Sequence, residues 1–161
     1  MRYFSLKASY IYGFFLCVAL LGGALYIQHV AHLVPCVLCV IQRFIVLILA
    51  FLFLIGLMFH RKLWLKIHAY VLFCISFVGG LFAARQVWLQ YFSSDPNVNC
   101  APSLSFMLQH LPLGETIKRA LESNGDCGQI DWTFMYLSIP VWTLIFFALV
   151  CGVTIFNLRR L

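Results

Sequence analysis

Four long apolar runs constrain this chain more than any other feature of its sequence. The first, from Tyr10 to Ile27, holds 18 residues without a charge. At about 1.5 Å per helical residue, such a run nearly crosses a hydrocarbon core of roughly 30 Å. Hydrophobic residues make up 63% of the chain and charged residues 10%, whereas soluble domains average about 45–50% and about 25%. The sequence therefore predicts an integral membrane protein.

The pattern predicts a single all-α membrane domain over residues 1–161, an up-down bundle of four transmembrane helices. The spans are expected at about 10–27, 36–59, 63–85 and 132–158, with external loops at about 28–35 and 86–131. In the long second loop, residues 113–121 are expected to form a short amphipathic helix lying on the membrane. The first run could be a signal peptide cleaved near Gly22-Gly23, but it continues past that site, which favours an uncleaved span.

Lysine and arginine gather on one side of such a bundle. Four spans place both termini on the same side, together with seven of the eleven basic residues: Arg2, Lys7, Arg61, Lys62, Lys66, Arg159 and Arg160. The positive-inside rule assigns this side to the cytoplasm, so the two external loops are expected to face the periplasm in a Gram-negative cell. The formal charge of +6 then reflects membrane orientation, and nucleic-acid binding is not expected.

The seven cysteines divide into two groups. Three fall inside apolar runs, where a lone thiol usually acts as a small buried hydrophobe: Cys17, Cys74 and Cys151. The other four lie at or in the external loops and make two pairs: Cys36 with Cys39, and Cys100 with Cys127. All four share one side of the membrane, which fits a compartment that permits disulfides.

Cys36 and Cys39 form a Cys-x-x-Cys motif at the start of the second span. Pro35 is compatible with a helix start, because the first turn does not need its missing N–H. Arg43 follows Cys39 by four residues, so the two cysteines and the arginine share one helix face. The positive end of the helix dipole and the guanidinium both favour the thiolate, which is the reactive form. The motif indicates a redox site at the water–lipid boundary.

Other chemistries use Cys-x-x-Cys as well. Haem attachment needs histidine after the second cysteine, where Val40 stands. A zinc site would need Cys100 and Cys127, which form no second short chelating loop, so no bound metal is expected. These two are best interpreted as a disulfide, either a structural one worth roughly 3–4 kcal/mol or an exchange partner for the first pair. A copper or other soft-metal handling membrane protein is the alternative from another class.

Several motifs together resemble the DsbB family, disulfide bond formation protein B. They are Pro-Cys-Val-Leu-Cys-x-x-x-Arg at 35–43, Gln28-His29, Trp88-Leu89-Gln90, Gly125-Asp126-Cys127 before Trp132, and Pro140-x-Trp142. The resemblance covers essentially the whole chain, including the order of spans and cysteines. A vitamin K epoxide reductase-like enzyme is a near rival, but those proteins carry the two cysteine pairs in the reverse order.

The resemblance implies a protein-thiol:quinone oxidoreductase of the bacterial inner membrane. Cys100–Cys127 would re-oxidise a periplasmic thioredoxin-fold oxidase of the DsbA type, with Cys100 forming the mixed disulfide. Cys127 would then exchange with Cys36, and Cys39, left as thiolate, would pass electrons to ubiquinone or menaquinone beside Arg43.

Two positions depart from the pattern of the family that the chain resembles. Gln42 stands where some carry an acidic residue, and Gln86 where some carry histidine. Glutamine can hydrogen-bond a quinone oxygen but cannot supply a proton by titrating, so a proton-donor role at position 86 is not expected.

Overall fold

The structure is a computed structural model that describes residues 2–30, 37–58, 61–92, 112, 133–134 and 136–160. Its helices are α1 (Arg2–Val30), α2 (Val37–Gly56), α3 (Lys62–Phe92) and α7 (Ile139–Arg160). Strands β1 (Thr133–Phe134) and β2 (Leu137–Ser138) form a short antiparallel hairpin before α7. All four helices are long and apolar enough to cross a membrane. The predicted all-α bundle of four transmembrane helices is confirmed.

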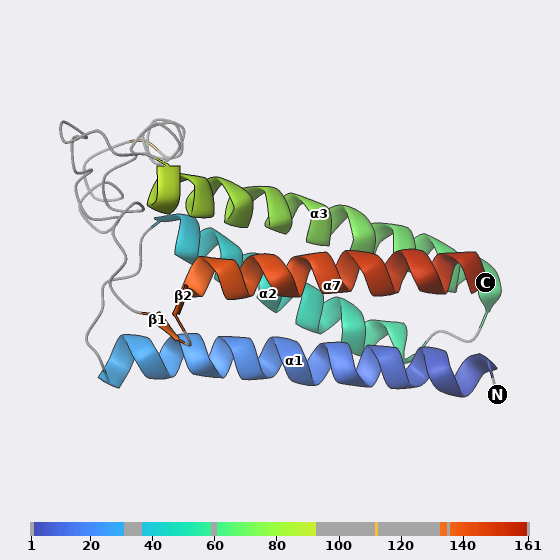
Figure 1. Ribbon diagram of the computed structural model, residues 1–161. Helices are drawn as coiled ribbons and strands as arrows, with labels where there is room; N and C mark the ends of the chain where they lie inside the picture. The colour runs from blue at the N-terminus through green and yellow to red at the C-terminus, as the bar shows by residue number, and fades with distance from the viewer. Residues whose placement is uncertain are drawn as a thin grey trace.

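The helices alternate in direction, so the start of α1 and the end of α7 lie at one end of the bundle (Figure 1). The end of α2 and the start of α3 lie at this end as well, so the seven basic positions gather there. The opposite end carries the end of α1, the start of α2, the end of α3 and the β1–β2 hairpin. Helix α2 packs against both α1 and α3, and α3 packs extensively against α7.

The helix boundaries differ from the predicted spans mainly at the end that carries Cys39. Helix α3 continues to Phe92, although the sequence placed the end of this span at Arg85 and residues 86–92 in a loop. It continues because Gln86 and Leu89 are buried, and Leu89 packs with Leu38 of α2. The helix that was expected over 132–158 begins only at Ile139, after the hairpin. Pro140 therefore stands in the first turn of α7, where a proline does not disturb the helix.

The other boundaries differ less, and two predictions fall outside the described residues. Helix α1 is longer than the predicted 10–27 at both ends, and α2 ends at Gly56, before a turn at Leu57–Met58. The predicted amphipathic helix at 113–121 and the first external loop, apart from residues 28–30 at the end of α1, lie outside the described part of the chain.

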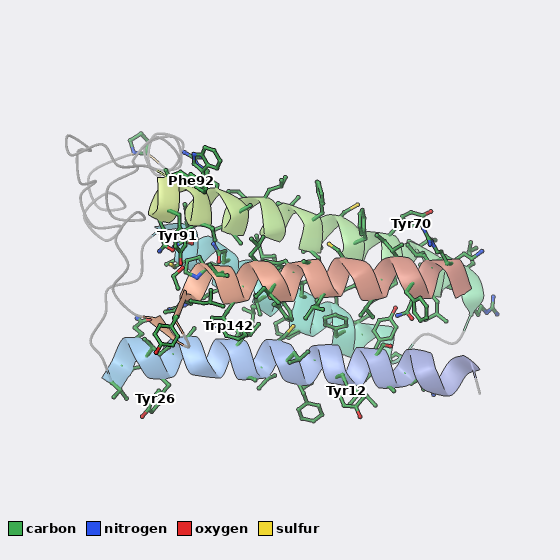
Figure 2. All side chains as sticks on the ribbon, viewed as in Figure 1. Tyr12, Tyr26, Tyr70, Tyr91, Phe92 and Trp142 are labelled. Carbon is green, nitrogen blue, oxygen red and sulfur yellow. The ribbon has the colours of Figure 1, made fainter. Side chains whose placement is uncertain are left out.

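The core consists of large apolar side chains at the helix contacts, including Leu49 of α2, Leu72 of α3 and Phe147 of α7. Many other large apolar residues are exposed, as expected of a bundle surrounded by lipid. Tyr12 and Tyr26 point away from α1 on the outer face of the bundle (Figure 2). Cys17 is fully buried, as predicted, and Cys151 is partly buried. The prediction is wrong for Cys74, which lies exposed on α3.

Tyr136, in the hairpin turn, has a backbone conformation that suits glycine. Its φ is 66°, and its side chain is 99% exposed. The left-handed conformation costs an L-residue about 1–2 kcal/mol. Glycine avoids this cost but loses more conformational entropy on folding, which cancels part of the gain in stability. We expect Tyr136→Gly to raise the free energy of unfolding by about 0.5–1 kcal/mol, measured by thermal unfolding in detergent. Tyr136→Ala removes the same side chain but keeps the strain, so an equal gain from alanine would contradict this explanation.

Candidate active site

The predicted site residues that the structure describes are Cys39 and Arg43, in the first two turns of α2. They lie at the end of the bundle opposite the two termini (Figure 1). Cys36, Cys100 and Cys127 lie outside the described residues. Helix α2 starts at Val37, so Cys39 lies in its first turn, where backbone N–H groups point toward the helix start and favour negative charge.

The sulfur of Cys39 accepts a hydrogen bond from α3. The donor is Nε2 of Gln86, at 3.0 Å from Sγ. Cys39 is partly buried, whereas Gln86 is only 2% exposed. A polar side chain buried to this degree must have hydrogen-bond partners, because an unmade hydrogen bond in an apolar environment is costly. Gln86 is therefore fixed in place by the groups that it contacts.

Gln86 is the middle of a polar chain that crosses three helices. Its Oε1 accepts a hydrogen bond from Nε2 of Gln42 on α2, at 2.7 Å. In turn, Oε1 of Gln42 accepts from the hydroxyl of Thr143 on α7, also at 2.7 Å. We call Thr143, Gln42, Gln86 and the sulfur of Cys39 the polar chain. Because buried amides require matched partners, it fixes how α2, α3 and α7 meet beside the sulfur.

Arg43 points to a different neighbour. Its guanidinium donates from Nη1 to Oε1 of Gln28 and from Nη2 to the carbonyl oxygen of Ala24, the latter at 3.2 Å. Both acceptors are on α1, near its end. Residues four apart share a helix face, as predicted for Cys39 and Arg43. Their polar ends nevertheless diverge, with the sulfur directed to α3 and the guanidinium to α1.

A second contact joins the hairpin to the end of α3. The hydroxyl of Ser138 on β2 donates to Oε1 of Gln90, at 2.7 Å, and Ser138 is buried. One turn before Gln90, Gln86 faces Cys39, so α3 presents two glutamines in succession to two different elements. The indole of Trp88 lies on the outside, stacked on Phe92 with ring centroids 4.6 Å apart.

The roles of Gln42, Gln86 and Thr143 in one network did not emerge from the sequence. The available signal was that uncharged polar residues inside apolar runs usually face the interior of a bundle, where they hydrogen-bond one another. That signal gives no pairing. Gln42 and Gln86 are 44 residues apart, and Gln42 and Thr143 are 101 apart.

Comparison with known proteins agrees with this fold. The family model described as disulfide bond formation protein DsbB matches residues 7–157. Disulfide bond formation protein B of Methylococcus capsulatus is 41% identical over 145 residues, which cover 89% of this chain and 88% of the relative. Disulfide bond formation protein B 1 of Pseudomonas aeruginosa is 40% identical over 155 residues, covering 96% and 95%. Disulfide bond formation protein B of Nitrosococcus oceani is 35% identical over 157 residues, covering 97% and 93%.

Proposed function

This chain belongs to the DsbB family of disulfide bond formation proteins, and we propose that it transfers electrons from a periplasmic thioredoxin-fold oxidase of the DsbA type to a membrane quinone. The observation that supports this most is the sulfur of Cys39. It lies at the start of a membrane-spanning helix and accepts a hydrogen bond from a buried amide. A sulfur in this environment is suited to react as a thiolate at the depth where a lipid-soluble acceptor can approach.

The proposed relay moves one pair of electrons through two cysteine pairs. A thiolate of the reduced partner attacks the Cys100–Cys127 disulfide at Cys100, and Cys127 leaves as a thiolate. The second partner thiol then displaces Cys100, which releases the oxidised partner. Cys127 and Cys100 are re-oxidised by the Cys36–Cys39 disulfide through a bond between Cys127 and Cys36. Cys39 is the thiolate that this exchange releases.

Loss of two electrons and two protons from Cys36 and Cys39 re-forms their disulfide, and ubiquinone or menaquinone would take both and leave as the quinol. The side chains present fit such an acceptor, because quinone oxygens accept hydrogen bonds and a guanidinium supplies five N–H donors in one plane. Arg43 would hold the quinone in this proposal. Its hydrogen bonds to Gln28 and Ala24 fix the guanidinium against α1, so its orientation is set before a quinone arrives.

The proposed orientation places both termini in the cytoplasm and the redox cysteines in the periplasm. The seven basic positions gather at the end of the bundle opposite Cys39 (Figure 1), which supports this orientation through the positive-inside rule. The proposed domain is the whole chain, with its two external loops on the periplasmic side. Membership of this family favours disulfide chemistry over the soft-metal alternative.

The test is a coupled assay with purified protein in detergent, a reduced thioredoxin-fold oxidase, and ubiquinone or menaquinone. We expect one quinol for each disulfide formed in the partner, and no quinol without the partner. A chelator of Cu(I) should leave the rate unchanged. Failure to reduce either quinone would refute the proposal, and loss of turnover with the chelator would favour the metal alternative.

A further inference from the structure

The polar chain has a direction, and that direction ends at the sulfur. The hydroxyl of Thr143 donates to Oε1 of Gln42, which leaves Nε2 of Gln42 to donate onward. Gln42 donates to Oε1 of Gln86, so Gln86 in turn has its amide N–H groups left for Cys39. The hydroxyl of Thr143 has one hydrogen and also lies 2.9 Å from the carbonyl oxygen of Pro140, so it does not set the direction by itself. The direction is set at the sulfur, because a thiolate can only accept and therefore turns the donor nitrogen of Gln86 toward it, and the oxygens of both glutamines toward Thr143.

We propose that Gln86 is a positioning residue that stabilises the thiolate of Cys39, and that Gln42 and Thr143 hold its amide in the donating orientation. A hydrogen bond to the charged form of a group favours that form, and hydrogen bonds to charged groups are stronger than those between neutral groups. Gln86 does not transfer a proton in this role. Gln86 thus acts on the sulfur itself.

This inference rests on the proposed function, because a stabilised thiolate at Cys39 is useful only if that sulfur donates electrons. Two charged side chains are close enough in sequence to act on the same sulfur. Arg43, on α2, is bonded to α1. Arg85, on α3, precedes Gln86 and is therefore turned about 100° around the helix.

The other neighbouring helices carry few ionisable side chains near the sulfur. Helix α7 has no ionisable side chain between Ile139 and Val150, and the last turn of α1 contributes the exposed His29. Gln86, which donates to the sulfur directly, is thus the residue to test.

The experiment measures how fast iodoacetamide alkylates Cys39 as a function of pH, resolved by peptide mass spectrometry. The background carries serine at Cys36, Cys100 and Cys127, so that Cys39 has no exchange partner of the proposed relay. We expect Gln86→Leu to move the midpoint of the alkylation profile upward by about one pH unit, which is a tenfold loss of thiolate at a given pH. Neither quinone nor partner is present, so the result is independent of whether the relay operates.

Gln90→Leu is the matched control. Gln90 is a partly buried glutamine one turn further along α3, and its Oε1 accepts from the hydroxyl of Ser138 on β2. This variant should leave the midpoint unchanged. An equal shift in Gln90→Leu would show that the end of α3 has merely loosened, and it would overturn the proposal.

Thr143 supplies a second, milder test that leaves both glutamines in place. Thr143→Val removes the hydrogen bond to Oε1 of Gln42 but leaves the contact of Gln86 with the sulfur, so we expect a smaller upward shift than in Gln86→Leu. Thr143→Ser keeps the hydroxyl and should restore the parent midpoint. An unshifted midpoint in folded Gln86→Leu, or in Thr143→Val should Gln86→Leu not fold, would overturn the assignment.

Discussion

Cys39→Ser is expected to reduce quinone at least about a thousandfold more slowly than the parent protein, a loss in the range that follows removal of a nucleophile. A serine hydroxyl is not ionised at neutral pH and forms no disulfide, so electrons that reach Cys36 have no route onward. The variant should nevertheless oxidise one equivalent of the reduced partner, because the Cys100–Cys127 disulfide of the proposed relay is still present. Absorbance of the quinone and thiol content of the partner measure the two quantities separately.

Two comparisons make this prediction specific to the relay. Cys100→Ser should lose the single equivalent as well as the turnover, because the partner then has no disulfide to attack. Cys74→Ser and Cys151→Ser should keep the parent rate, and Cys17→Ala should keep it per folded molecule, since Cys17 is part of the core. Quinone reduction above a few per cent of the parent rate in Cys39→Ser would remove Cys39 from the electron path.

The four spans could be predicted from the sequence because each depends on local properties. The length of an uncharged run and its hydropathy set whether a helix can cross a bilayer. The end of α3 was misplaced for a physical reason. Arg85 looked like the edge of a span, but a charged residue that is only half-buried does not end a helix when the next turn has a partner. Gln86 has such a partner in α2, through its hydrogen bonds with Gln42 and Cys39.

The motif around Cys39 was predictable in part. Spacing correctly placed Cys39 and Arg43 on one face of a helix. It could not show that the guanidinium bonds to Gln28, or that Gln86 donates to the sulfur, because both contacts join different helices. Helical periodicity identifies the face of a residue but not the residue opposite it, so polar pairs between helices require the three-dimensional packing.

Gly79→Ala is expected to destabilise the bundle by about 1–3 kcal/mol, the usual cost of overpacking a well-filled core. A Cβ at this position would lie 2.5 Å from Cε1 of Phe147 and 3.0 Å from Cγ2 of Ile45. Phe147 is 1% exposed, so its ring has no room to move away. For a chain of this size the midpoint of thermal unfolding should fall by roughly 2–4 °C for each kcal/mol.

Gly80→Ala separates this packing effect from helix propensity. Both variants replace glycine by alanine in α3 and gain about 1 kcal/mol of propensity, but a Cβ at Gly80 meets only Cβ of Phe147, at 3.7 Å, which is an ordinary contact. Gly80→Ala should therefore be neutral or stabilising. If the two variants unfold at the same temperature, the close approach of α3 and α7 is not what makes glycine necessary at position 79.

The contact of Gly79 with Ile45 and Phe147 also supports the site. Each of these three residues lies one or two helical turns from a member of the polar chain. Gly79 is seven residues before Gln86 on α3, Ile45 is three residues after Gln42 on α2, and Phe147 is four residues after Thr143 on α7. The ring of Phe147 thus meets α2 and α3 directly beneath the hydrogen bonds that hold Gln86 to the sulfur. We expect Gly79→Ala to raise the midpoint pH of Cys39 alkylation and to lower the stability of the bundle. Gly80→Ala should neither raise this midpoint nor lower the stability. A destabilised Gly79→Ala with an unchanged midpoint would show that the polar chain holds its geometry without the packing below it.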